Sequence, residues 1–97
     1  MNIEGTSGND ILDGTIDADS IVGLDGGDVI DGKGGDDTID GGAGADNLTG
    51  GSGNDLVFGG DGDDFFGAND IGDDTLYGGA GDDNLSDRRG FNVLDGG

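Results

Sequence analysis

The chain contains no cysteine, proline, histidine or tryptophan, and these absences remove several classes of protein. Without cysteine there are no disulfides, and without histidine or cysteine the usual zinc sites and the Ser-His and Cys-His nucleophile pairs are excluded. Hydrophobic residues make up 30% of the 97 residues and aromatic residues 5%, which is too little for an ordinary packed core. Apolar runs are no longer than Leu56-Val57-Phe58, so neither a transmembrane span nor the apolar core of a signal peptide is expected.

Positive charge is equally scarce, because three Lys and Arg face 23 Asp and Glu and the formal net charge is −20. A chain this acidic repels the phosphates of nucleic acids and anionic membranes, so it predicts no nucleic-acid partner and no membrane insertion. Its expected partners are cations. High net charge with low hydrophobicity is also typical of disordered chains, and composition alone favours that interpretation.

The order of the residues changes this interpretation, because a nine-residue period runs through residues 5–95. Units such as GGAGADNLT and GGSGNDLVF follow one another from Gly5, with a one-residue insertion at Ala68. The eighth place is always apolar, from Leu12 to Leu94. The sixth place is aspartate in every unit but the last, which has Asn92; the aspartates are Asp10, Asp19, Asp28, Asp37, Asp46, Asp55, Asp64, Asp74 and Asp83.

Each unit predicts a tight turn followed by a very short strand. Two glycines within Gly-x-x-Gly-x-Asp destabilise helix and strand and allow a positive φ, so this segment is expected to turn. The three residues after the Asp, such as 38–40, place one apolar side chain between two mostly polar ones, which indicates a strand with one inward residue. The sequence therefore predicts one all-β domain over residues 1–97, a parallel β-roll of about five turns with two units in each turn.

On this geometry alternate units share an edge of the roll, so the sixth-place residues form two columns of carboxylates. Neighbours about 4.8 Å apart repel each other by ~1 kcal/mol in bulk water and by more near a protein surface. A divalent cation between successive turns removes the repulsion by taking oxygen from two Asp and from turn carbonyls, which is the all-oxygen shell of Ca²⁺. Mg²⁺ is disfavoured because it keeps its waters and requires a smaller octahedron.

One Ca²⁺ in each gap between same-side aspartates gives seven ions, or eight if Asn92 contributes its amide oxygen. The few inward apolar side chains contribute much less free energy than ordering the chain costs. We therefore expect the chain to be unfolded without calcium and to fold when calcium binds.

The unit GGxGxDxUx, where U is a large apolar residue, resembles the RTX (hemolysin-type) calcium-binding nonapeptide repeat. The match is strongest in 23–67 and 78–86. This resemblance implies a right-handed β-roll whose Ca²⁺ ligands are the sixth-place Asp side chains and main-chain oxygens of the second and fourth places of one turn and the first and third of the next. The glycines at these places are Gly8, Gly26, Gly35, Gly44, Gly53, Gly62 and Gly81 (fourth), Gly23, Gly32, Gly41, Gly50, Gly59 and Gly78 (first), and Gly42, Gly51, Gly60 and Gly79 (second).

Proteins with such repeats are typically secreted by bacteria through a one-step channel and fold outside the cell, where calcium is plentiful. The resemblance thus implies an extracellular location and an attached catalytic or toxin domain in a larger parent protein. Because the repeat pattern runs to both ends of the chain, at Ile3 and at Gly96-Gly97, we interpret the chain as a fragment. A monomer is expected, and the open ends could also stack end to end.

Three departures from the repeat affect this prediction. Asp17 replaces a fourth-place glycine and must either accept a left-handed backbone or distort its turn. The insertion at Ala68 and Asn69 is expected to bulge one corner of the roll. The last unit, residues 87–95, has lost two ligand features and gained two arginines, so the roll is expected to weaken there.

Other interpretations of the same residues are less consistent with the register. A solvated acidic tail would not keep four places in register. Adjacent pairs such as Asp36-Asp37 could suggest catalytic carboxylates, but they recur at the fifth and sixth places, and we predict no enzyme. An EF-hand requires a closing Glu, and Glu4 is the only one. Residues 27–33 fit part of a P-loop but lack its Ser or Thr.

The outward aromatic residues Phe58, Phe65 and Tyr77 leave one alternative open. They either cover the strands or form an adhesive face for a partner or a sugar. The second possibility treats the chain as a carbohydrate-binding appendage of a secreted polysaccharide enzyme, such as an alginate epimerase, or as an adhesin or surface-layer repeat. Only Lys33, Arg88 and Arg89 could meet an acidic polymer, which argues against it.

Overall fold

The computed structural model describes residues 2–67, 72–85 and 93–95, which form eleven short parallel strands joined by turns. The strands are β1 (Asn2–Glu4), β2 (Ile11–Asp13), β3 (Ser20–Val22), β4 (Val29–Asp31), β5 (Thr38–Asp40), β6 (Asn47–Thr49), β7 (Leu56–Phe58), β8 (Phe65–Phe66), β9 (Thr75–Tyr77), β10 (Asn84–Leu85) and β11 (Val93–Asp95). Each strand begins directly after the sixth place of its unit, as the period predicts.

The core is one row of apolar side chains between two sheets. The eighth-place side chains point inward because successive residues of a strand face opposite sides. Those at 0–1% exposure are Ile21, Ile30, Ile39, Leu48, Val57, Phe66 and Leu76. Ile3 and Leu12 pack against them and are partly buried. The inward position of the eighth place is therefore confirmed for these residues, whereas the side chains of Leu85 and Leu94 lie outside the described part.

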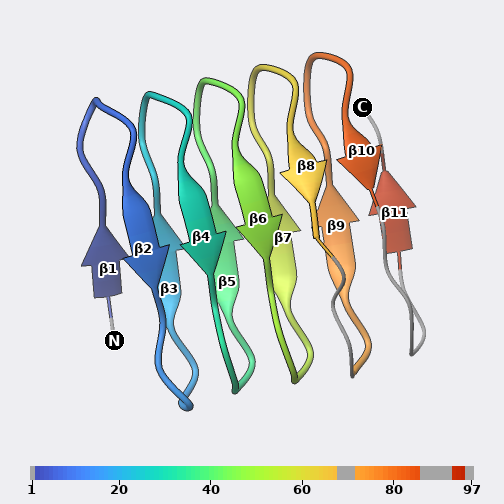
Figure 1. Ribbon diagram of the computed structural model, residues 1–97. Coiled ribbons are helices and arrows are strands. Elements are labelled where there is room, and N and C mark those ends of the chain that lie inside the picture. The colour runs from blue at the N-terminus through green and yellow to red at the C-terminus, as the bar shows by residue number, and fades with distance from the viewer. Residues whose placement is uncertain (1, 68–71, 86–92, 96–97) are drawn as a thin grey trace.

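The strands alternate between the two sheets, so each strand pairs with the strand two units further along the chain (Figure 1). One sheet has the order β1-β3-β5-β7-β9-β11 and the other β10-β8-β6-β4-β2, with every pair parallel. Nothing in the described residues is helical, so no helix there could cross a membrane. The prediction of an all-β parallel β-roll is confirmed, with about four turns where about five were expected.

The roll is flat, with principal extents of 31 × 27 × 13 Å. A thickness of 13 Å suits two sheets with a single layer of side chains between them, because packed sheets lie about 10 Å apart. All turns lie along two opposite edges, and the N- and C-terminal strands lie at opposite ends of the roll (Figure 1). The fold therefore places every Gly-rich turn beside the equivalent turn of the next coil.

The insertion at Ala68 changes the spacing between paired strands but not their register. Leu56 pairs with Thr75, 19 residues on, whereas Thr38 pairs with Leu56, 18 residues on. Val57 and Leu76 both remain in the core row. The expected bulge itself involves residues 68–71, which lie outside the described residues, as does the start of the last unit.

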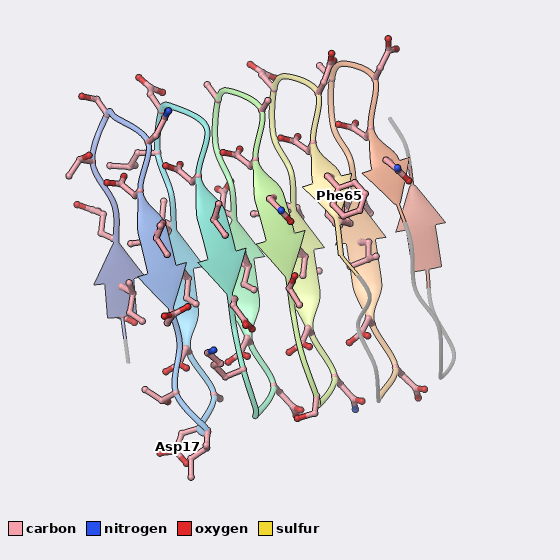
Figure 2. All side chains as sticks on the ribbon, in the orientation of Figure 1. Asp17 and Phe65 are labelled. Atoms are coloured by element: carbon pink, nitrogen blue, oxygen red, sulfur yellow. The ribbon has the colours of Figure 1, made fainter. Side chains whose placement is uncertain are left out.

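Two of the three outward aromatic residues, Phe58 and Tyr77, pack on each other along one sheet. The rings of Phe58 on β7 and Tyr77 on β9 are stacked, with centroids 5.3 Å apart and planes 10° apart. Phe65 lies on the outer face of β8 in the other sheet and is 47% exposed (Figure 2). Phe58 and Tyr77 each cover one face of the other ring, and both remain 37% exposed.

Candidate metal centres

The sixth-place aspartates of each edge are joined by a regular ladder of hydrogen bonds. The backbone N–H of one Asp donates to Oδ1 of the sixth-place Asp in the next turn of the same edge. For example, Asp28 N–H donates to Asp46 Oδ1 at 2.8 Å, and Asp37 N–H donates to Asp55 Oδ1 at 2.9 Å. The same bond recurs at every same-side step from Asp10 to Asp83 and from Asp19 to Asp74. One oxygen of each carboxylate is therefore held in place by the preceding turn.

The other oxygen of these carboxylates is buried without a hydrogen-bond donor. Among the described residues, seven side-chain oxygens are of this kind: Oδ2 of Asp28, Asp37, Asp46, Asp55, Asp64, Asp74 and Asp83. Six of these side chains are only 1–2% exposed. A buried carboxylate oxygen without a partner costs free energy that a cation recovers. The number of such oxygens equals the number of gaps between same-side aspartates.

First-place glycines bring a backbone carbonyl close to Oδ2 of Asp28, Asp37, Asp46 and Asp64. A Cβ built on Gly23 would lie 2.6 Å from Asp28 Oδ2 and 2.7 Å from the carbonyl oxygen of Gly41. In the next unit, a Cβ on Gly32 would lie 2.5 Å from Asp37 Oδ2 and 2.7 Å from the carbonyl oxygen of Gly50. A carboxylate oxygen and a carbonyl oxygen thus face one small space, which stays open only because the first place lacks a side chain.

The remaining glycines let successive turns stack closely. Fourth-place glycines from Gly26 to Gly81 have positive φ, and a Cβ on Gly26 or Gly44 would lie 2.4–2.5 Å from the same-place carbonyl of the preceding turn. Second-place Gly42, Gly51, Gly60 and Gly79 also have positive φ and stack in the same way. The second- and fourth-place carbonyls therefore lie against the equivalent glycines of the next turn along each edge.

Leu24 and Lys33 occupy second places with the same left-handed backbone, at φ values of 69° and 71°. A residue with a Cβ is strained there, at a cost of order 1 kcal/mol.

We predict that Leu24→Gly stabilises the calcium-loaded chain and raises its Tm by about 4–8 °C, since about 1 kcal/mol shifts a domain of this size by that amount. Thermal unfolding in excess calcium measures the shift; Leu24→Ala, which keeps the Cβ, serves as the control. A glycine variant no more stable than the alanine variant would contradict the strain.

The first aspartate of each edge differs from the others, because a threonine donates hydrogen bonds to both of its carboxylate oxygens. Thr15 N–H donates to Asp19 Oδ2 at 2.6 Å, and the Thr15 hydroxyl donates to both carboxylate oxygens. Thr6 makes the same bonds to Asp10, with the N–H at 2.6 Å. The Thr15 N–H also holds the pKa of Asp19 below its usual value. Each column therefore begins with a carboxylate that the chain itself satisfies.

Asp17 does not adopt the left-handed backbone of the fourth-place glycines. Of the two outcomes expected from the sequence, the turn is thus the one that changes, and Asp17 lies at the end of this turn between β2 and β3 (Figure 2). Gly8, at the same place one unit earlier, also lacks a positive φ. Since both turns contain a second-place threonine, the threonine explains the altered turn better than Asp17 alone.

Burial changes the acidity of the carboxylates in the middle of each column. Desolvation raises the pKa of Asp46 and of Asp55 to about 7 and that of Asp37 and of Asp64 to about 6, with hydrogen bonds from neighbouring N–H groups opposing it. Desolvation also raises the pKa of Asp28. Without a cation, burial therefore moves these carboxylates toward their protonated form, and most strongly at Asp46 and Asp55.

These shifts predict that acid stabilises the metal-free roll. The folded pKa values of about 6–7 lie above the unfolded value of about 3.9, so the contribution to stability is complete below about pH 4 and is lost as the pH rises through 6–7. Circular dichroism in chelator should show strand signal beginning to rise as the pH falls below about 7. A gain confined to pH values below 4, where exposed carboxylates protonate, would contradict this effect of burial.

The arrangement can hold a hard cation through oxygen atoms alone. No group of three or more acidic side chains converges on one point within the described ranges. The donors at each gap are instead carboxylate oxygens from the column and carbonyl oxygens from the stacked turns, which suit Ca²⁺. The unpartnered Oδ2 atoms and the open space beside them fit such an ion.

The structure brings together most of the residues that the sequence predicts as ligands. The sixth-place carboxylates and the first-place carbonyls meet at Asp28, Asp37, Asp46 and Asp64, and second- and fourth-place carbonyls stack along the same edges. Third-place carbonyls are partly used, because Asp61 O and Ala80 O accept bonds from Gly44 and Gly62 N–H. Sequence reasoning missed the closure by Thr6 and Thr15, although a threonine four residues before an Asp is a signal for such a turn.

Comparison with protein families agrees with this geometry. The family model for the RTX calcium-binding nonapeptide repeat (4 copies) matches residues 4–39, 31–66 and 77–97. Comparisons with curated proteins and with solved structures gave no match. The matched segments span most of the chain and leave out residues 67–76, which include the turn at Asp74. The chain belongs to the family of RTX calcium-binding nonapeptide repeats.

Proposed function

We propose that this chain is a calcium-triggered folding module without catalysis of its own. The observation that carries the proposal is the set of seven buried Oδ2 atoms without a hydrogen-bond donor. In a metal-free roll these oxygens repel one another within each column and receive no compensating bond. Calcium supplies that compensation only when the turns are stacked, so binding and folding become one event.

One Ca²⁺ for each buried Oδ2 gives seven ions per chain. Asp28, Asp46, Asp64 and Asp83 account for four on one edge, and Asp37, Asp55 and Asp74 for three on the other. Asp10 and Asp19 are the first aspartates of the two edges, and each borders the first gap of its edge. Their own Oδ2 atoms accept hydrogen bonds from the N–H groups of Thr6 and Thr15. An eighth ion would need Asn92, which lies outside the described residues.

The proposed location and parent protein rest on the family alone. We propose an extracellular module of a secreted bacterial protein, unfolded where calcium is scarce and folded where it is plentiful. In that role it stabilises an attached domain whose activity is separate from the repeats. The expected state of the module is a monomer.

Circular dichroism of the chain in chelator, in CaCl₂ and in MgCl₂ tests this function. In chelator we expect a spectrum without strand signal, and millimolar CaCl₂ should produce the strand signal of the roll. MgCl₂ at the same concentration serves as the matched control, because Mg²⁺ keeps its waters and fits the oxygen shell poorly. Full strand signal in chelator, or equal folding by Mg²⁺, would contradict the proposal.

A further inference from the structure

The fifth place of the repeat, directly before the sixth-place Asp, forms a second ladder between same-side turns. Where this place holds Asn or Asp, its side-chain Oδ1 accepts a hydrogen bond from the fifth-place N–H of the next turn. The bonds are Gly27 N–H to Asn9 (2.7 Å), Asn54 N–H to Asp36 (2.8 Å), Asp73 N–H to Asn54 (2.8 Å) and Asp82 N–H to Asp63 (2.8 Å). Asn and Asp make the bond at the same lengths, so it depends on the acceptor oxygen and not on charge.

The two ladders donate in opposite directions between successive turns of one edge. In the fifth-place bond the later turn donates, and in the sixth-place bond the earlier turn donates. We call this pair of bonds between two turns the lock. Between the turns at Asp36 and Asn54, the Asp36 side chain accepts the Asn54 N–H. One residue further on, Asp55 Oδ1 accepts the Asp37 N–H at 2.9 Å. The first bond holds the backbone just before Asp55, and the second holds one oxygen of its carboxylate. The remaining oxygen, Oδ2, is left in one orientation at the gap.

The lock is incomplete at the fifth places that have no side-chain oxygen, Ala18, Gly27 and Ala45. Gly27 and Ala45 are successive on one edge, so two adjacent steps of that edge lack the second bond. Between the turns at Ala45 and Asp63, backbone bonds such as Gly44 N–H to Asp61 O remain, but of the two side-chain bonds only the sixth-place one is made, from Asp46 N–H to Asp64 Oδ1 at 3.0 Å. The Ala45 methyl cannot accept the Asp63 N–H.

We propose that the fifth-place Asn and Asp are positioning residues that hold the backbone beside each calcium site once the turns stack. This inference rests on the proposed calcium function. Because these bonds form only between stacked turns, they stabilise the folded, calcium-bound chain relative to the unfolded chain and lower the calcium concentration that folding requires. The steps from Gly27 to Ala45 and from Ala45 to Asp63 are consequently the weakest on their edge. The amino acid at the fifth place therefore sets the calcium concentration that each pair of successive turns needs in order to stack.

Ala45→Asn completes a missing lock and tests the proposal as a gain of function. Ala45 is exposed and already has a Cβ, so the longer side chain has room. In excess calcium we expect Tm to rise by about 4–8 °C, the effect of one typical hydrogen bond in a domain of this size. We also expect slower hydrogen exchange at the Asp63 amide and slower calcium release into chelator. Ala43→Asn, the same substitution at the exposed third place, is the matched control and should change none of these.

Asn54→Ala and Asn54→Asp test the same role by loss and rescue. The alanine variant removes the acceptor of the Asp73 N–H, so it should lower Tm by a similar amount and speed exchange at that amide. The aspartate variant keeps the acceptor and should retain the protection of Asp73. If both variants lose it equally, the acceptor role is wrong.

The experiments distinguish a failure of the calcium function from a failure of the positioning role. If the unsubstituted chain gains no strand signal with calcium, the proposed function itself is wrong. If it does fold with calcium but Ala45→Asn matches Ala43→Asn in Tm and in Asp63 exchange, the positioning role is overturned and the calcium function stands.

Discussion

Asp46→Asn should remove two calcium ions from the loaded chain and lower its Tm by at least about 10–20 °C. Asp46 lies in the middle of its column, with gaps above and below it. Asparagine still accepts the Asp28 N–H through Oδ1 but lacks the charge of the buried Oδ2. If each of the two sites weakens roughly tenfold, the loss is about 2.8 kcal/mol, which corresponds to that shift in a domain of this size.

Asp61→Asn is the matched control, because it makes the same change in charge at an exposed third place. Calcium-binding calorimetry and thermal unfolding on the two variants separate the local effect from the change in net charge. We expect about five bound ions in Asp46→Asn and about seven in Asp61→Asn. Equal ion counts and equal Tm values in the two variants would refute the column geometry.

Gly32→Ala should damage one calcium site by filling it with a methyl group. The new Cβ would lie 2.5 Å from Asp37 Oδ2 and 2.7 Å from the Gly50 carbonyl oxygen, both shorter than real Cβ contacts. Relief requires a shift of the carboxylate or of the backbone, and overpacking of this kind typically costs 1–3 kcal/mol besides the lost ion. We expect Tm in calcium to fall by about 10 °C or more, with one ion fewer bound.

Gly34→Ala, in the same unit, is its matched control. A Cβ there meets its nearest neighbours, the Ile16 Cα and carbonyl oxygen, at 3.5 Å, and Gly34 has no positive φ. This variant should keep all its ions and be unchanged or slightly more stable, since alanine reduces the freedom of the unfolded chain. If the two alanine variants behave alike, the open space beside Asp37 Oδ2 is not a metal site.

The nine-residue period predicted the strands and the columns because both follow from position within the unit. Ile39 could be placed inside and Asp37 at a turn from their places alone, and the structure agrees. The residue 19 positions after Leu56 pairs with it despite the insertion, because the chain keeps its apolar eighth places in the core row. The apolar pattern of the repeat and the packing of the whole roll therefore favour the same strand pairing.

What the period could not predict lies at the second and fifth places, where the residue type varies. The closure of Asp19 by Thr15 depends on a backbone conformation that differs from the glycine turns, and the repeat treats the two as equivalent. The lock between Asp36 and Asn54 joins residues 18 apart and becomes visible only when the turns are stacked. The left-handed backbone of Leu24 contradicts its local preference and is imposed by the neighbouring turns.

Bound calcium counted against strand signal in the same samples tests the central claim most directly. Equilibrium dialysis with radioactive calcium, followed by circular dichroism of each dialysed sample, gives both quantities over a calcium titration. We predict that they rise together from nothing and reach a plateau at about seven ions per chain, one for each buried Oδ2. Complete strand signal with no calcium bound, or seven ions bound to a chain without strand signal, would contradict the coupling of binding to folding.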